Sequence, residues 1–171
     1  MNGSKLIYLD NQATTQTDPN VVEKMLPYFT KFMGNPSSDH SFGIEARSAV
    51  SWTRDIITKA WDLDCRQLVF TAGASESINL ALKGFASSPF STARKKILTT
   101  NIEHSATIET LKRLEMAGFE IINLPVDNEG LISTKQLESS LSEDTLLVSI
   151  ILVNNERSEE RRVGKECRSR W

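Results

Sequence analysis

The sequence predicts an α/β fold with a mostly parallel central sheet flanked by helices. Strand-like and helix-like segments alternate along the 171 residues, which is the pattern of βαβ units. Residues 145–153 form a nearly continuous apolar, β-branched run, typical of a strand buried on both faces. The helical segments repeat apolar residues every three to four positions, so each helix has one apolar face for packing against a sheet.

The first half of the chain opens with a strand-like run at 6–9 and a helix that begins at residues 17–19. Thr17 or Asp18 can cap that helix, and Pro19 suits its first turn. Apolar residues at helical spacing over 21–32 should bury one face, and Pro27 is expected to kink or break the helix. A longer helix is expected over about 42–63, with an apolar stripe and a solvated opposite face.

A short strand at 68–70, a turn of small residues and a helix beginning at the serines open the second half. Gly118 is expected to end a later helix, and the Ser133–Gln136 capping box to begin another. The remaining elements are strands at 96–100, 120–124 and 145–153 and helices over about 105–114 and 134–141.

The charge distribution and the length of the apolar runs limit the partners that this protein can have. Residues 157–171 carry six Lys/Arg and three Asp/Glu and are therefore basic, whereas the rest of the chain is acidic. Because basic and aromatic residues do not interleave before that tail, we expect no nucleic-acid partner. No apolar run reaches the length of a bilayer span and no signal region is visible at the N-terminus, so we expect no membrane partner and a cytoplasmic location.

Polar groups follow three of the predicted strands, and in parallel sheets ligands gather beyond the carboxyl ends of strands. They are residues 73–77, His104 and Asn155. The small residues and serines at 73–77 suit a phosphate at a helix N-terminus, although an ordinary capped turn has the same composition. His104 and Asn155 could bind a ligand, or could serve only as a loop histidine and a turn residue. No metal site is expected, because no Cys or second His accompanies His104.

Two further residues draw attention but suit structural roles. His40 lies in a loop rich in turn-forming residues, where it is structural or at the rim of a site. Cys65 has no base beside it in sequence, which favours an inert thiol.

Five motifs in order resemble the cysteine desulfurases, members of the class V aminotransferase group of pyridoxal 5'-phosphate (PLP) enzymes. The resemblance covers about residues 5–156 and implies part of the large domain of a PLP-dependent transferase, truncated and N-terminal. The motifs are Tyr8-Leu9-Asp10-Asn11-Gln12-Ala13-Thr14-Thr15, Gly34-Asn35-Pro36-Ser37-Ser38 with His40 and Gly43, Phe70-Thr71-Ala72-Gly73-Ala74-Ser75-Glu76-Ser77, Glu103-His104 and Val153-Asn154-Asn155-Glu156.

The resemblance implies a role for each matching residue. Ala74 and Ser75 would hold the phosphate of PLP, with Ser75 standing where the family often has threonine. His104, the one candidate catalytic residue, would stack on the pyridine ring. Asn155 would donate a hydrogen bond to the phenolic oxygen of the cofactor. Asn35 would lie on the substrate side of the site, in a segment that also contains His40.

The chain also departs from the family pattern. No segment resembles the family's cofactor-linking lysine, its sulfur-accepting cysteine or the aspartate that pairs with the pyridine nitrogen, and the surroundings of Lys165 and Cys167 match none of these motifs. We therefore expect two parts: residues 1–156 as an N-terminal portion of the PLP domain, and residues 157–171 as a non-native or disordered tail. By itself the chain is expected to be inactive.

For the family, the implied reaction removes sulfur from L-cysteine, leaving alanine and an enzyme-bound persulfide. A sulfur-acceptor protein, iron–sulfur cluster assembly and a homodimer come with that resemblance. Two alternatives stay open: another class V enzyme, such as a selenocysteine lyase or an aminotransferase, and a non-catalytic module that binds phosphate or a partner.

Overall fold

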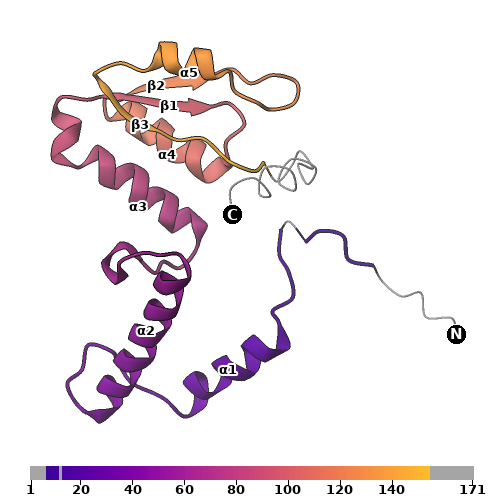
Figure 1. Ribbon diagram of the computed structural model, residues 1–171, viewed down its shortest axis with the longest axis vertical. Helices are drawn as coiled ribbons and strands as arrows, with labels where there is room; N and C mark the ends of the chain where they lie inside the picture. The colour runs from indigo at the N-terminus through magenta and orange to yellow at the C-terminus, as the bar shows by residue number, and fades with distance from the viewer. Residues whose placement is uncertain (1–6, 12, 155–171) are drawn as a thin grey trace, which may run out of the picture. The chain divides into compact units, whose positions relative to one another are not determined.

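The computed structural model describes residues 7–11 and 13–154. The chain divides into two compact units, with the boundary between Phe70 and Thr71. Figure 1 shows helices alone in the first unit and strands with helices in the second. Within the described ranges, no helix combines the length and the apolar character that crossing a bilayer requires. The expected tail at 157–171 lies outside these residues.

The first unit contains the helices α1 (Pro19–Thr30) and α2 (Ser41–Ala60) and the short 3-10 helix η1 (Cys65–Gln67). The carboxylate of Asp18 caps α1 by accepting from the N–H of Asn20 at 2.7 Å, as the sequence predicts. The helix continues past Pro27 to Thr30, so the proline does not break it, and the kink that was the other expectation stays a prediction. A proline there removes one intrahelical donor but leaves the flanking turns bonded.

The prediction that α1 buries one face is wrong. None of its side chains is buried, and Phe29 is 75% exposed. In the part of the chain that the structure describes, every buried apolar side chain of the core belongs to the second unit. The apolar periodicity of α1 and α2 therefore produces amphipathic helices whose large apolar side chains are not buried in the described structure.

Two glycines in the first unit allow a close approach of backbone to backbone. A Cβ on Gly34 would lie 2.2 Å from the carbonyl oxygen of Phe42, and a Cβ on Gly43 would lie 2.2 Å from that of Ser38. Neither neighbour can move like a flexible side-chain end, because both are main-chain atoms. The loop between α1 and α2 can therefore fold back on itself only with glycine at these positions.

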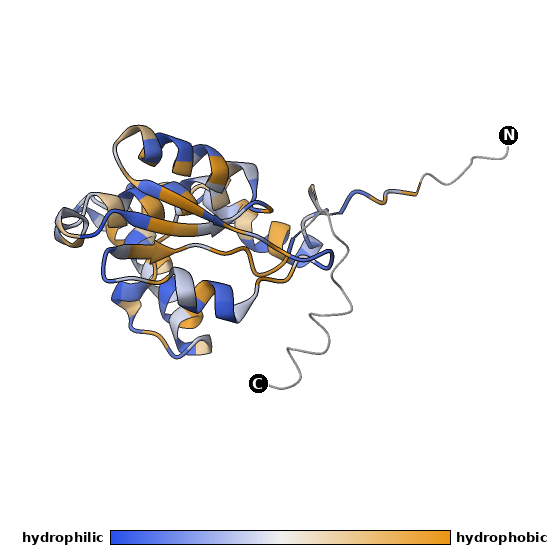
Figure 2. Cartoon of the chain, turned by 90° about the horizontal axis from the view of Figure 1, so that it is seen from above, coloured by the Kyte–Doolittle hydropathy of each residue, from blue (hydrophilic) through white to orange (hydrophobic). Residues whose placement is uncertain are grey.

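The second unit contains a three-stranded parallel sheet in the order β2-β1-β3. Its strands are β1 (Lys96–Thr100), β2 (Glu120–Leu124) and β3 (Thr145–Val148), and its helices are α3 (Ala74–Ala86), η2 (Pro89–Thr92), α4 (Ser105–Met116) and α5 (Thr134–Ser140). Each strand contains two or three apolar residues, and the hydrophobic parts of the chain are drawn orange in Figure 2. Parallel strands joined by helices confirm the predicted fold class.

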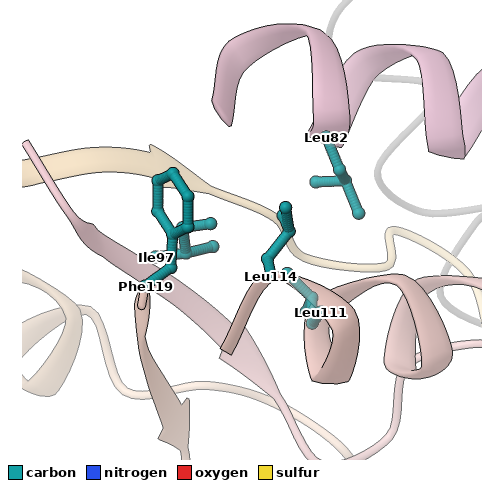
Figure 3. Close-up of a cluster of buried hydrophobic side chains, with 5 residues drawn as sticks. All are labelled: Leu82, Ile97, Leu111, Leu114 and Phe119. Carbon is teal, nitrogen blue, oxygen red and sulfur yellow. The ribbon is translucent and has the colours of Figure 1, made fainter. Parts of the chain in front are cut away.

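The core of the second unit lies where α3 and α4 pack on the sheet (Figure 3). Ile97 on the central strand is fully buried, and Leu111 and Leu114 on α4 cover it together with Leu82 of α3 and Phe119. Alternation along β1 turns Leu98 to the opposite face, where it is also fully buried. Gly118, with φ of 92°, ends α4 one residue before Phe119, as predicted.

Hydrogen bonds link the N-terminal ends of β1 and β3. The N–H groups of Lys95 and Lys96 both donate to the carbonyl oxygen of Asp144 at 3.1 Å. The Ser142 hydroxyl, and then the Lys96 ammonium 3.2 Å away, hold the pKa of the Asp144 carboxylate below its usual range.

Three predicted strand segments differ from the structure. Residues 7–9 and 68–70 form no strand, because the described chain offers neither of them a neighbouring strand to pair with. The segment 145–153 forms a strand only over Thr145–Val148, and its residues are half-buried or exposed instead of fully buried. β3 pairs with β1 alone and is thus an edge strand here, which explains its partial exposure.

Truncating Leu111 should destabilise the second unit strongly, because its side chain is 3% exposed and fills the space between α4 and β1. We expect Leu111→Ala to lower the free energy of unfolding by about 2–5 kcal/mol. Leu152 is 88% exposed and provides the control. Leu152→Ala should change the free energy of unfolding by less than about 0.5 kcal/mol. Urea unfolding followed by circular dichroism measures both. Equal effects of the two substitutions would contradict this core.

Exposed apolar side chains on α1 and at the end of β3 should make the chain associate in solution. Leu26 and Phe29 on α1 in the first unit, and Leu152 after β3 in the second, are more than half exposed, and exposed apolar side chains favour association. We expect oligomers in size-exclusion chromatography with light scattering at micromolar concentrations, shifted toward monomer by Leu26→Glu with Phe29→Lys. A single monomeric species of the unsubstituted chain would refute the expectation.

Candidate active site

Helix α3 begins without a side-chain cap. Its N-cap residue, Gly73, has no side chain to accept a hydrogen bond, whereas side-chain atoms of Asp18, His40, His104 and Ser133 cap the other α-helices. The first helical bond runs from the N–H of Ser77 to the carbonyl oxygen of Gly73 at 3.1 Å. The N–H groups of Ala74, Ser75 and Glu76 therefore have no acceptor within residues 7–11 and 13–154.

The turn that carries these three donors is exposed. A Cβ added to Gly73 would meet no atom within 4 Å, and residues 72–77 are exposed. Backbone donors and the positive end of the helix dipole make such a terminus suitable for an anion. The Ser75 hydroxyl lies in the same first turn and adds a further hydrogen-bonding group.

Two side-chain contacts shape this turn. The hydroxyls of Thr71 and Ser77 lie 2.7 Å apart and close the turn around Gly73. The Glu76 carboxylate accepts from the N–H of Ala72 at 2.6 Å, one residue before the N-cap Gly73, and not from any of the three donors. Its charge opposes an anion, while the donors and the helix dipole attract one.

His104 follows β1 and caps α4. Its Nδ1 accepts from the N–H of Ala106 at 3.1 Å, and the residue is exposed. Because Nδ1 accepts, the proton of the neutral ring lies on Nε2. Both expected uses of this residue are thus compatible: the ring is fixed by the cap, and its exposed side can still contact a ligand.

Side-chain hydrogen bonds fasten the loop before His104 to the chain that follows β3. Glu103 is 9% exposed, and its Oε1 accepts from the Thr100 hydroxyl at 2.8 Å and from the N–H of Ile151 at 2.7 Å. The Asn154 amide donates to the carbonyl oxygen of Ile102 at 2.8 Å. The segments that follow the two neighbouring strands are therefore held side by side.

The start of α3 lies at the same end of the second unit as the carboxyl ends of the strands. α3 packs against α4 and β3, and only a short connection through η2 leads from its end to the start of β1. The helix is about 20 Å long, so its beginning lies at the opposite end from that connection (Figure 1). The structure thus brings Ala74 and Ser75 to the end of the unit where His104 lies.

The other candidate residues lie either in the first unit or outside the described residues. Asn155 lies outside the described residues. Asn35 belongs to the first unit, where its Oδ1 accepts from the N–H of Ser37 at 2.9 Å. His40 caps α2 through Nδ1, and Cys65 is an exposed free thiol. The roles assigned to all these residues stay predictions.

Sequence reasoning overlooked Glu103 as an anchor and the hydroxyl pair of Thr71 and Ser77. The available signal for Glu103 was a glutamate next to a helix-capping residue and three residues after the end of a strand. The hydroxyl pair follows from a turn whose geometry the sequence alone does not specify. Within the described ranges, no three His, Cys, Asp or Glu side chains gather into a set that could hold a metal ion.

Comparison with known proteins decides the family. A profile of the family described as Aminotransferase class-V matches residues 7–161. The chain belongs to the class V aminotransferase family. It is 44% identical over 168 residues to a mitochondrial cysteine desulfurase of Drosophila melanogaster, covering 96% of this chain and 36% of that protein.

Two solved structures are similar as well. A NifS-like protein superposes with a TM-score of 0.81 at 41% identity, covering 85% of this chain and 40% of that one. SspA in complex with cysteine also gives a TM-score of 0.81, at 36% identity, covering 87% and 43%. The resemblance to cysteine desulfurases is thus confirmed, and the chain spans about two fifths of the length of these class V relatives.

Replacing Gly73 by aspartate should separate anion binding from stability. The extended backbone at Gly73 (φ 165°) suits any residue, so an aspartate there can cap α3 and raise the free energy of unfolding by about 0.5 kcal/mol. Its charge should meanwhile weaken phosphate binding at least about tenfold. Gly73→Ala, which adds only a methyl group in open space, is the matched control. Calorimetric titration with phosphate and urea unfolding measure the two effects, and unchanged phosphate affinity in Gly73→Asp would exclude this site.

Proposed function

We propose that the second unit supplies the phosphate-binding end of a PLP site in a cysteine desulfurase. The observation that carries the proposal is the uncapped start of α3, with three backbone donors, at the same end of the unit as His104. Family membership supports it, since relatives named cysteine desulfurase share 42–44% identity with this chain.

The donor set fits a phosphate ester. Three N–H groups in one helical turn, a hydroxyl on Ser75 and open space above Gly73 match an anion with several acceptor oxygens. Ala74 would contribute its backbone N–H alone, which agrees with a residue whose small side chain permits a close approach. These groups would bind and orient the phosphate and leave the rest of the cofactor free to extend toward His104.

His104 would supply a flat aromatic face for the pyridine ring. Its cap on α4 holds the imidazole through Nδ1, so the ring would be preorganised. When bound, PLP serves as the electron sink for reactions at the Cα of an amino acid. For Asn155 we propose the hydrogen bond to the phenolic oxygen, and for Asn35 a position on the substrate side.

We infer L-cysteine as the substrate of the complete enzyme, by analogy with the desulfurase relatives and with SspA, which was solved in complex with cysteine. Transfer of the sulfur to an acceptor protein for iron–sulfur assembly, a homodimer and a cytoplasmic location complete the proposal. Since no segment of this sequence resembles the family's cofactor-linking lysine or sulfur-accepting cysteine, the chain alone should bind PLP without releasing sulfide.

Titration of the 171-residue chain with PLP, pyridoxal and inorganic phosphate tests this function. Pyridoxal lacks the phosphate and reports reaction of the aldehyde with surface lysines, while inorganic phosphate reports anion binding alone. We expect PLP to bind more tightly than either, by about tenfold or more, because phosphate contacts and ring stacking act together. Sulfide release from L-cysteine, measured in parallel, should not exceed that of PLP in buffer.

Two outcomes would contradict the proposal. Equal affinity for PLP and inorganic phosphate would favour a simple phosphate-binding module. Sulfide release with turnover would show that the chain carries a complete catalytic apparatus. Release of selenide from selenocysteine without reaction of cysteine would instead favour a selenocysteine lyase.

A further inference from the structure

We propose that Glu103 is a positioning residue for His104: its buried carboxylate fastens the loop that carries the histidine to the chain after β3. The expected effect on PLP binding rests on the proposed function, whereas the attachment of the loop rests on contacts in the structure. Glu103 is among the few acidic side chains that the described chain buries, at 9% exposure.

The Glu103 carboxylate accepts a hydrogen bond that a backbone carbonyl would accept in a regular parallel sheet. Beyond β3, the N–H of Ser149 still donates to the carbonyl oxygen of Leu98 at 2.8 Å. In a continued parallel ladder the N–H of Ile151 would donate to the carbonyl oxygen of Thr100. It donates instead to Oε1 of Glu103 at 2.7 Å. The side chain thus extends the pairing after β1 has ended.

Because the Glu103 carboxylate replaces a backbone carbonyl as acceptor, the two strands can separate without losing a hydrogen bond. β1 ends at Thr100 and turns toward α4, while the chain after β3 runs on. The Thr100 hydroxyl donates to the same carboxylate oxygen at 2.8 Å. Two donors and the nearby start of α4 offset the cost of burying the charge.

His104 follows Glu103 directly and is itself the cap of α4. The imidazole is therefore held from two sides: by its own bond to the N–H of Ala106, and by the anchored residue before it. The bond from Asn154 to the carbonyl oxygen of Ile102 fixes the same loop one residue earlier. Loss of the Glu103 bonds should therefore shift the ring.

Two substitutions distinguish the effect of the Glu103 side-chain length from the effect of its charge. Glu103→Asp keeps the charge but is one methylene too short to meet both donors. Glu103→Gln keeps the length and an acceptor oxygen but is neutral. Glu109→Gln on the exposed surface of α4, where Glu109 pairs with Lys112, is the matched control.

Nuclear magnetic resonance of the 171-residue chain gives the first two readouts without any cofactor. The chain has two histidines, so His40 in the first unit is an internal control for the ring signal of His104. In Glu103→Asp we expect a shifted His104 ring signal, an unchanged His40 signal and about fivefold faster amide exchange at Ile151. Glu103→Gln and Glu109→Gln should resemble the unsubstituted chain.

Titration with PLP gives the third readout. Glu103→Asp should weaken PLP binding by about three- to fivefold, and Glu103→Gln should leave it near the original value. If the unsubstituted chain does not bind PLP, the proposed function fails, and the ring signal and amide exchange still decide the role of Glu103.

Three results would overturn the proposal. The first is an unchanged His104 signal and Ile151 exchange in Glu103→Asp. The second is a Glu103→Gln variant that behaves like Glu103→Asp, because the length and acceptor oxygen of the side chain would then not be sufficient to hold the loop. The third is a displaced His104 ring with undiminished PLP affinity, because the ring position would then be irrelevant to the cofactor.

Discussion

The parallel pairing of β1 with strands on both sides is the constraint on which the candidate site depends. β1 lies between β2 and β3, and its Ile97 and Leu98 are fully buried. Burial of both faces fixes the register, because a slip by one residue would move Ile97 out of the cluster with α3 and α4. The end of β1, and hence the loop that carries His104, is fixed by the same packing.

The beginning of α3 is linked to that constraint by the chain's own connectivity. Leu82 on α3 enters the core beside Leu111 and Leu114, and a short connection leads from α3 to β1. The sheet thus determines where the uncapped helix terminus lies, while the absence of a side chain at Gly73 leaves its donors available. Stability and binding depend on different residues of one helix, which allows each to be altered separately.

Local signals in the sequence were sufficient to predict most elements of the second unit. The apolar run at 96–100, Gly118 as a helix stop and Ser133 as a cap all have local causes. The strands expected at 6–9 and 68–70 have equally apolar sequences, but strand formation requires a partner, which no local pattern reveals. The same reason explains why the buried strand expected over 145–153 is shorter and more exposed.

For the candidate site, the sequence predicted which loops carry polar groups but not how the loops are held. Glu103 appeared only as part of a motif, because its bond to Ile151 spans 48 positions and arises from the sheet order. The apolar faces of α1 and α2 were recognised from their periodicity, yet periodicity shows only that a face is apolar and not what covers it. Accordingly, among the described residues of the first unit the amphipathic helices contribute no buried apolar side chain.

Mapping amide chemical shifts of the isotopically labelled chain during addition of PLP tests the central claim most directly. The account predicts that the largest changes occur at residues 74–76 and 101–104, which belong to the start of α3 and to the loop after β1. Changes confined to lysines on the surface, or to residues of the first unit, would contradict a cofactor site at this end of the sheet.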